Sequence, residues 1–367
     1  MNDQLKTKDR DLSVSPHASS LAPPTLRMVA WELTRSCNLA CVHCRASAEK
    51  GPYPGELSTA EVHKVMDDIA VVGKPVIILT GGEPLLRGDI FDLAAYGTEK
   101  GFRMVMATNG TLFDEQTVQK MKASGIQRIS ISLDGPTPET HDAFRRVKGS
   151  FEGSLQGIQM ARKGGLEFQI NTTITRVNLH LIPDILKLAV DLGAAALHIF
   201  LLVPTGRGKE LQNQEISADD YERTLHWFYE QTDKVPLQLK ATCAPHYYRI
   251  LRQRAKLEGK KVTQKEFGLD AMTRGCLGGI SFCFISNTGQ VQPCGYLELN
   301  CGNVREKSFQ EIWTSSGIFQ KLRNFDAYEG KCGRCEFRRV CGGCRARAYE
   351  ISGNYMAEEP YCVYEPL

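Results

Sequence analysis

The chain has 367 residues, of which 42% are hydrophobic and 24% are charged, and its formal net charge is +3. This charge balance gives no reason to expect a nucleic-acid or membrane partner, and no apolar run is long enough to cross a bilayer. The polar segment 1–25 lacks the apolar centre of a signal peptide. We therefore expect a disordered N-terminal tail on a cytoplasmic protein.

Strand and helix patterns alternate from residue 26 onward. Ser58 and Glu61 have the spacing of a capping box, and the apolar stripe that follows them to Ile69 predicts a helix. Strands that alternate with helices indicate a parallel sheet, which is either open and doubly wound or curved into a partial barrel. The predicted strands are Arg27–Leu33, Val76–Leu79, Arg103–Thr108, Arg128–Leu133, Glu167–Thr173 and Ala196–Leu202, and the further predicted helices are Asp114–Ser124, Phe151–Gly164 and Leu181–Gly193.

The periodic pattern weakens after residue 208. Residues 209–270 look helical and charged, which is typical of a bridge between domains. From residue 271 the chain is rich in Cys and Gly, as in a small domain held together by metal. We predict four regions: a tail (1–25), a core domain (26–208), a helical bridging region (209–270) and a Cys-rich domain (271–367).

The 13 cysteines are unevenly distributed along the chain. Three lie between positions 37 and 44, none between 45 and 242, and ten between 243 and 362. Without an export signal we expect a reducing compartment, where disulfides are rare. The clustering therefore favours metal binding.

The first cysteine group, Cys37, Cys41 and Cys44, directly follows the first predicted strand with the spacing C-x3-C-x2-C. Three thiolates can hold three irons of a [4Fe–4S] cube and leave the fourth iron open, whereas ordinary electron-carrying cubes take four cysteines. An open iron is a site where a substrate or cofactor binds. The alternatives are a zinc site that also uses His43, or buried free thiols.

This motif and the segments behind it resemble the radical S-adenosylmethionine (SAM) superfamily. In that family the open iron binds SAM, and one-electron reduction releases a 5′-deoxyadenosyl radical. The resemblance implies an α/β fold with a partial (β/α)6 TIM-like barrel, and it makes Cys37, Cys41 and Cys44 the cluster ligands.

Several segments that follow predicted strands resemble the family's SAM-binding motifs. Residues 80–84 look like its GGEP loop, where paired glycines allow close approach of a ligand and Glu83 offers an anion for the SAM ammonium. Each polar residue could instead simply cap a turn. The predicted SAM-binding residues are Gly81, Gly82, Glu83, Thr108, Asn109, Ser132, Asp134 and Asn171.

The C-terminal cysteines resemble the SPASM domain of radical SAM enzymes. The resemblance rests on Gly289-x4-Cys294 and on the run C-x2-C-x5-C-x2-C that begins at Cys332, although many members have three residues in its last gap. It implies two auxiliary [4Fe–4S] clusters, while zinc ribbons are the alternative. The implied ligands are Cys276, Cys283, Cys294 and Cys344 for the first cluster and Cys332, Cys335, Cys341 and Cys362 for the second, which leaves Cys243 and Cys301 without a role.

Residues 28–37 and 241–249 resemble the radical SAM heme synthases of the siroheme-dependent heme pathway. Those enzymes decarboxylate two propionates of iron-coproporphyrin III to vinyl groups and form protoheme. The resemblance implies an iron-porphyrin substrate, a low-potential electron donor and an electron acceptor. For substrate binding we consider Arg207, Lys240 and Arg249 for the carboxylates, and His246 or Tyr247 for the porphyrin iron.

Three other functions are compatible with the sequence. One is a related enzyme of the heme d1 or didecarboxysiroheme branch of tetrapyrrole maturation. A peptide-modifying SPASM maturase is another, but we expect the tail to be too short for a leader-binding domain. The third is a zinc-stabilised binding protein, which would contain zinc without acid-labile sulfide. The basic candidates for substrate binding could also be solvated surface charges.

Overall fold

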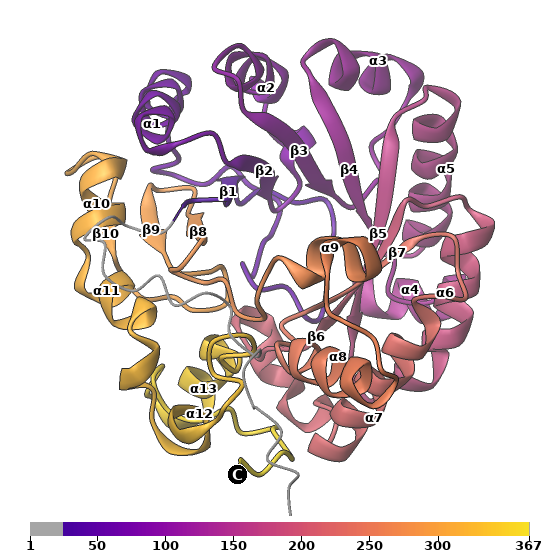
Figure 1. Cartoon of the computed structure of the whole chain (residues 1–367). Coiled ribbons are helices and arrows are strands. Elements are labelled where there is room, and N and C mark those ends of the chain that lie inside the picture. The colour runs from indigo at the N-terminus through magenta and orange to yellow at the C-terminus, as the bar shows by residue number, and fades with distance from the viewer. Residues whose placement is uncertain (1–24, 367) are drawn as a thin grey trace, which may run out of the picture.

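A computed structural model describes residues 25–366, so the predicted tail lies outside the described residues except for position 25. Within this range the strands form one 10-stranded sheet in the order β10-β9-β8-β1-β2-β3-β4-β5-β6-β7 (Figure 1). Neighbours from β8 through β7 are parallel, whereas β9 pairs antiparallel with β8 and with β10. The predicted α/β class is confirmed. The strands are β1 (Met28–Thr34), β2 (Val76–Gly81), β3 (Arg103–Thr108), β4 (Ile126–Ser132), β5 (Glu167–Ile174), β6 (Ala196–Leu201), β7 (Gln238–Thr242), β8 (Phe282–Ile285), β9 (Gln290–Gln292) and β10 (Gly302–Asn303).

The helices that follow the early strands cover the outer side of the curved sheet (Figure 1). The capping box at Ser58 begins α1 as predicted, and the side chains from Val62 to Ile69 that form its stripe are buried. The helices are α1 (Thr59–Val72), α2 (Ile90–Glu99), α3 (Glu115–Ala123), α4 (Pro138–Arg145), α5 (Ser150–Lys163), α6 (Ile182–Asp191), α7 (Ala218–Gln231), α8 (His246–Leu257), α9 (Gln264–Phe267), α10 (Phe309–Ser315), α11 (Gly317–Arg323), α12 (Gly330–Arg334) and α13 (Arg345–Ser352).

The region 209–270 contains helices, as predicted, but also strand β7, which the sequence pattern did not reveal. β7 pairs in parallel with β6 and so extends the curved sheet by one strand. Only Leu239 and Ala241 of its five residues are buried. This alternation of buried and exposed positions is too short to be recognised in a charged segment of the sequence.

The two faces of the sheet differ in chemistry. Side chains such as Ile129 and Ile170 are buried toward the helices. Many of the alternate positions on β4 to β7 are polar and partly buried, and register aligns Ser132 with Asn171, Asn171 with His198, and His198 with Lys240. Because aligned residues of neighbouring strands project from the same face, these side chains form a polar row on the inner face of the curved sheet.

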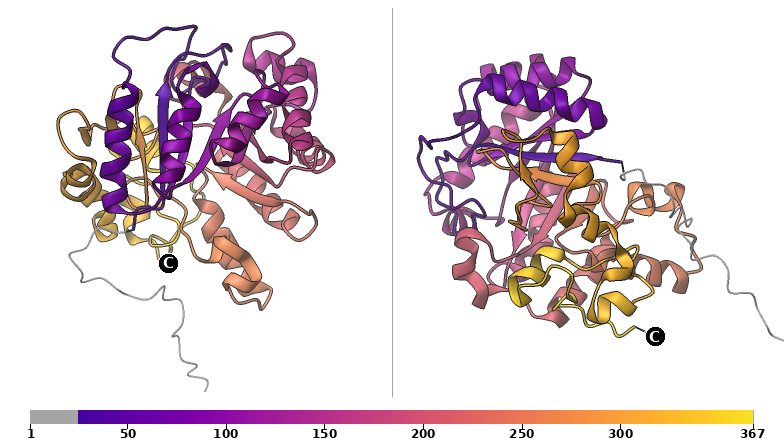
Figure 2. Two further views of the ribbon diagram at one scale, coloured as in Figure 1. Left: turned by 90° about the horizontal axis from the view of Figure 1, so that it is seen from above. Right: turned by 90° about the vertical axis from the view of Figure 1, so that its left-hand side faces the viewer.

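The C-terminal region packs beside the strands on the side of the molecule away from α5 (Figure 2). Strand β8 joins this region to the barrel through its pairing with β1. Arg347 on α13 makes a second link, because its guanidinium donates to the carbonyl oxygens of Leu201 at 3.3 Å and Leu202 at 3.0 Å. The C-terminal region is therefore fixed against the carboxyl end of β6, where the ligands of parallel α/β folds bind.

None of the helices between residues 25 and 366 combines the length and the apolar character that a membrane span requires.

Candidate active site

The three thiols of the first cysteine group lie on the loop that follows β1. Each sulfur accepts a hydrogen bond: Cys37 from the N–H of Leu39 at 3.4 Å, Cys41 from the Arg145 guanidinium at 3.4 Å, and Cys44 from the N–H of Ala48 at 3.3 Å. Such donors stabilise thiolate charge, so the loop fits ligation of an iron–sulfur cluster. Burial raises the pKa of Cys37 to about 11, and cluster binding must therefore drive off its proton.

A buried ion pair lies directly behind this loop. Asp134 and Arg145 are 2.6 Å apart between Oδ2 and Nη2, and Asp134 also accepts from the N–H of Thr173 at 2.8 Å. The carboxylate of Asp134 thus pairs with the residue that donates to Cys41, and this pairing gives no support to the prediction that Asp134 contacts SAM. No sequence pattern distinguishes Arg145 from its neighbour Arg146, so sequence reasoning missed it.

Arg207 also belongs to the cysteine loop rather than to a substrate site. Its guanidinium donates to the carbonyl oxygens of Cys41 at 2.9 Å and Ala48 at 2.8 Å, and its own N–H donates to that of Cys44 at 3.0 Å. These bonds fix the loop from the C-terminal side of β6. The prediction that Arg207 binds a substrate carboxylate is not supported by this position, since Nε, Nη1 and the backbone N–H all donate to the loop. Nη2 is buried and has no hydrogen-bond partner among the described residues.

The glycines of the GGEP loop are required by the backbone beside them. A Cβ atom on Gly81 would lie 2.3 Å from the carbonyl oxygen of Thr34, and one on Gly82 would lie 2.3 Å from that of Ser36. The N–H groups of Gly82 and Glu83 donate to the same two carbonyls at 2.7 and 2.8 Å. The glycines therefore let this loop pack against the start of the cysteine loop. From the sequence we expected them to allow the close approach of a ligand instead.

Glu83 joins the ends of β2 and β3. Its buried carboxylate accepts from the hydroxyl of Thr108 at 2.8 Å and from the N–H groups of Asn109 at 2.8 Å and Leu85 at 3.3 Å. Burial nevertheless raises its pKa to about 7. A nearby ammonium would favour the charged carboxylate. The charge of Glu83 is therefore complementary to the ammonium of SAM, which it is predicted to contact.

The other predicted SAM-binding residues lie at the carboxyl ends of neighbouring strands. Asn109 donates to the side chain of Asn38 on the cysteine loop at 2.8 Å. Ser132 ends β4 and is in register with Asn171 on β5, whose amide oxygen accepts from Gln169 at 3.0 Å. The structure thus brings Glu83, Asn109, Ser132 and Asn171 to the edge of the sheet that carries the cysteine loop, and their contact with SAM stays a prediction.

A second group of thiols forms where the C-terminal region meets the barrel. Cys344, at the start of α13, packs with Cys243 and Cys294. The N–H of Cys276 donates to the carbonyl oxygen of Cys341 at 3.1 Å, close to Cys344 in the chain. We call Cys243, Cys276, Cys294 and Cys344 the junction thiols.

Cys283 is not among the junction thiols, which contradicts its predicted role in the first auxiliary cluster. Its neighbour Phe284 lies under the Arg45 guanidinium, 4.4 Å from the ring centroid, and so faces the cysteine loop. Successive side chains of a strand point to opposite faces, so Cys283 points away from that loop into the main core. The charges next to its thiol are those of Cys301 and Arg323.

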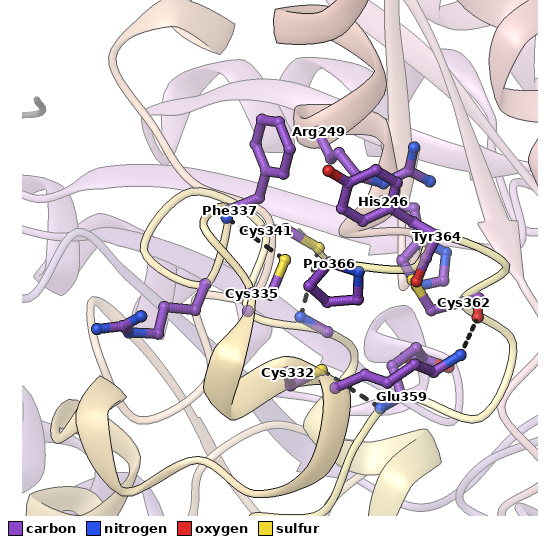
Figure 3. Close-up of a pocket in the computed structure, with 14 residues that line it drawn as sticks. His246, Arg249, Cys332, Cys335, Phe337, Cys341, Glu359, Cys362, Tyr364 and Pro366 are labelled. Atoms are coloured by element: carbon purple, nitrogen blue, oxygen red, sulfur yellow. Dashed lines mark hydrogen bonds between the residues drawn. The ribbon is translucent and has the colours of Figure 1, made fainter. Parts of the chain in front are cut away.

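A third group of thiols surrounds a cavity at the C-terminal end of the molecule (Figure 3). The cavity is lined by Cys332, Cys335, Cys341 and Cys362, the four ligands predicted for the second auxiliary cluster. No three His, Cys, Asp or Glu side chains between residues 25 and 366 converge as ligands of one metal ion would. The four thiols around this cavity match the number of ligands that a [4Fe–4S] cluster takes.

The shortened gap between Cys341 and Cys344 has a structural explanation. Gly342 and Gly343 both have left-handed backbone angles, with φ of 77° and 62°. Two such residues in succession are tolerated by glycine alone, and they turn the chain sharply. Cys341 therefore lines the cavity while Cys344, three residues later, lies with the junction thiols.

The remaining residues predicted to bind substrate are separated by the structure. His246 and Arg249 line the cavity of the third thiol group, where Arg249 is also 2.5 Å from Glu222 (Figure 3). Tyr247 is buried in the main core, edge-on to Phe228, so it does not face a substrate. Lys240 lies on the inner face of the sheet, and among these candidates it is the one positioned to reach a bound ligand there.

A curved parallel sheet, a three-thiol loop after its first strand and thiol groups in a C-terminal region together define a radical SAM protein. The radical SAM superfamily pattern matches residues 31–189, and the SPASM pattern, an iron–sulfur cluster-binding domain, matches residues 276–336. The chain is 61% identical over 343 residues, 94% of each chain, to the AdoMet-dependent heme synthase of Nitratidesulfovibrio vulgaris. It is 54% identical to that of Methanosarcina barkeri over 93% of this chain and 97% of the relative. The chain therefore belongs to the radical SAM family of the AdoMet-dependent heme synthases.

Solved structures support the fold. A crystal structure of Streptococcus suis SuiB bound to S-adenosylmethionine has a TM-score of 0.73, with 15% sequence identity, over 93% of this chain and 78% of SuiB. At this identity the likeness concerns the fold alone. Membership of the radical SAM and SPASM families implies SAM and [4Fe–4S] clusters as cofactors of this chain.

Proposed function

We propose that this chain is a radical SAM oxidative decarboxylase that converts two propionates of iron-coproporphyrin III to vinyl groups and so forms protoheme. The observation that carries the proposal is its 61% identity to an AdoMet-dependent heme synthase along 94% of both chains. The match spans 343 residues, so it is not confined to a single domain of the chain.

The chemistry of the substrate explains why the chain needs more than one redox centre. When bound, SAM and the three-thiolate cluster supply a radical that removes a hydrogen atom. If the β-carbon of a propionate loses one hydrogen atom, loss of CO₂ from the carboxylate leaves a vinyl group and one surplus electron. Each vinyl group therefore requires an electron acceptor, and two are formed per substrate.

Three [4Fe–4S] clusters are part of the proposal. Cys37, Cys41 and Cys44 hold the SAM-binding cluster, and two auxiliary clusters occupy the junction thiols and the cavity of Figure 3. Auxiliary clusters with four thiolates have no open iron, so electron transfer is the chemistry that they supply. The external electron donor and acceptor are further partners in this proposal, and the reducing cytoplasm is the compartment that suits 13 cysteines.

The inner face of the sheet provides groups for substrate carboxylates. Lys240 and Arg128 both lie on this face and act electrostatically on His198 between them. Burial, together with those two cations, lowers the pKa of His198 to about 3, so its ring is neutral. Arg128 is already paired with Glu167, so Lys240 is the cation of this face that we propose for a propionate.

The experiment that tests the substrate assignment offers several tetrapyrroles to the same enzyme. The reconstituted chain is incubated anaerobically with SAM, a reductant and one of three substrates: iron-coproporphyrin III, didecarboxysiroheme or a heme d1 precursor. We expect stepwise loss of two carboxyl groups from iron-coproporphyrin III alone, as measured by mass spectrometry. Turnover of another tetrapyrrole, with iron-coproporphyrin III unchanged, would show that the chain belongs to a sister reaction.

A further inference from the structure

We infer that Cys243 is the fourth protein ligand of the first auxiliary cluster, in the place that the SPASM pattern gives to Cys283. This inference rests on the proposed function, because it presupposes an auxiliary cluster at the junction thiols. It concerns a cysteine that lies outside the matched iron–sulfur domain, residues 276–336.

Packing places Cys243 with the other three junction thiols. Cys243 and Cys294 both pack against the small buried cluster that contains Cys344. Burial, followed by the charges of Cys344, Cys294 and Cys276, raises the pKa of the Cys243 thiol. The thiols whose charges act on Cys243 are thus the other three junction thiols, two of which share the buried cluster with it. Four cysteines at one place match the full ligand set of a [4Fe–4S] cube.

The backbone of Cys243 is held in an unusual conformation. Its φ is 56°, in the left-handed region that residues with a side chain rarely adopt. Its carbonyl oxygen accepts hydrogen bonds from the hydroxyl of Tyr221 at 2.7 Å and from the guanidinium of Arg347 at 3.2 Å. A non-glycine residue in this region is strained and persists where its surroundings enforce it, which is typical of functional sites. Here the hydrogen bonds from Tyr221 and Arg347 hold the turn next to the buried cluster that contains Cys344.

Cys283 cannot replace Cys243 without a rearrangement of the sheet. It lies within β8, in register with Val29 of β1, and it is fully buried in the main core. Phe284 takes the opposite face of the strand, the one that contacts Arg45. Moving the Cys283 thiol to that face would require a one-residue shift of β8, which would turn every side chain of this strand over.

The assignment has a structural consequence for the enzyme. Cys243 directly follows β7, the strand whose Lys240 faces the inside of the barrel. A cluster ligated by Cys243 is therefore bonded to the barrel wall as well as to the C-terminal region. The first auxiliary cluster then fixes the two regions together beside the inner face of the sheet.

The test counts auxiliary clusters in the full-length chain. The triple variant Cys37→Ala, Cys41→Ala, Cys44→Ala serves as background, so that iron and sulfide report the auxiliary clusters only. We expect about eight irons and eight sulfides per chain in this background, as two [4Fe–4S] clusters contain. Adding Cys243→Ala should lower the iron and sulfide contents or change the electron paramagnetic resonance (EPR) spectrum of one reduced cluster. Adding Cys283→Ala should leave the iron content, the sulfide content and the EPR spectrum unchanged.

Controls make each outcome informative. Cys301→Ala removes a thiol next to Cys283 and should behave like the background. If Cys243→Ala does not fold, Cys243→Ser retains the side-chain volume and should still change the EPR spectrum, because oxygen replaces sulfur at one iron. An unchanged spectrum with Cys243→Ala, or loss of a cluster with Cys283→Ala alone, would overturn the inference. A background with about four irons would instead contradict the proposal of two auxiliary clusters.

Discussion

Arg145 and Asp134 form a buried ion pair behind the three-cysteine loop, with 2.6 Å between Nη2 and Oδ2. The pair connects the carboxyl end of β4 to the Cys41 sulfur, to which Arg145 also donates. Removing one partner of a buried pair leaves an uncompensated charge in the protein interior. The pair therefore stabilises both the fold and the position of the loop.

We expect Arg145→Met and Asp134→Asn each to lower the free energy of unfolding by about 3–5 kcal/mol, because each leaves a buried charge unpaired. The double variant should lose less than the sum of the two. Anaerobic urea unfolding measures all three. The exposed pair Lys163–Glu115 provides the control, and Lys163→Met should leave the free energy of unfolding almost unchanged. Additive losses would show that Arg145 and Asp134 do not act as a pair.

Replacement of Cys41 should abolish SAM cleavage. Cys41→Ala removes one of the three thiolates of the SAM-binding cluster, so we expect no detectable 5′-deoxyadenosine and loss of about four irons per chain. Cys301→Ala is the matched control, since Cys301 packs against the main core away from all three thiol groups. Chromatography of the SAM products and iron analysis check both variants. Substantial 5′-deoxyadenosine from Cys41→Ala would contradict the cluster assignment.

The stability of the SAM-free chain should depend on pH through Glu83. Burial raises the pKa of this carboxyl from 4.5 to about 7, so the folded chain holds its proton more tightly than the unfolded chain does. The stabilisation is complete below the unfolded pKa and is lost as the pH rises through the folded pKa, by up to about 3 kcal/mol. Glu83→Gln should flatten this part of the pH profile of urea unfolding. Equal pH profiles for both proteins would show that Glu83 ionises normally.

Lys240 should contribute to substrate binding without affecting the clusters. We expect Lys240→Met to raise the KM for iron-coproporphyrin III about tenfold, since a hydrogen bond to a charged group contributes about 1.5–3 kcal/mol. Lys240→Arg should retain most of the affinity. Tyr247→Phe is the control, because Tyr247 lies in the main core. The KM of this variant for iron-coproporphyrin III should stay unchanged. Steady-state kinetics at saturating SAM separates these cases, and an unchanged KM for Lys240→Met would exclude Lys240 from the substrate site.

Sequence patterns predicted the first part of the fold well. The strands β1 to β6 agree closely with their predicted ranges, because each is a short apolar run between clear turn signals. Strand β7 could not be predicted, since its few residues are stabilised by pairing with β6 rather than by their own pattern. The same is true of β8, whose place beside β1 depends on a contact between distant parts of the chain.

The candidate site was predictable where residues act through spacing. The thiols at Cys37, Cys41 and Cys44 follow from one short motif and its position after a strand. Residues that act through tertiary contacts were not predictable. Arg207 was expected to bind substrate and instead fixes the cysteine loop, and Cys283 was expected to ligate a cluster although strand alternation directs it into the core. In both cases the residue type was informative, but the direction of the side chain depends on the fold.

The most direct test of the proposed reaction follows one hydrogen atom. Iron-coproporphyrin III with deuterium at the β-carbons of its two reactive propionates is incubated anaerobically with the reconstituted chain, SAM and a reductant. Mass spectrometry should then find one deuterium in 5′-deoxyadenosine for each carboxyl group lost, and a product with two vinyl groups. Decarboxylation accompanied by unlabelled 5′-deoxyadenosine, or SAM cleavage with both propionates intact, would contradict the proposed function.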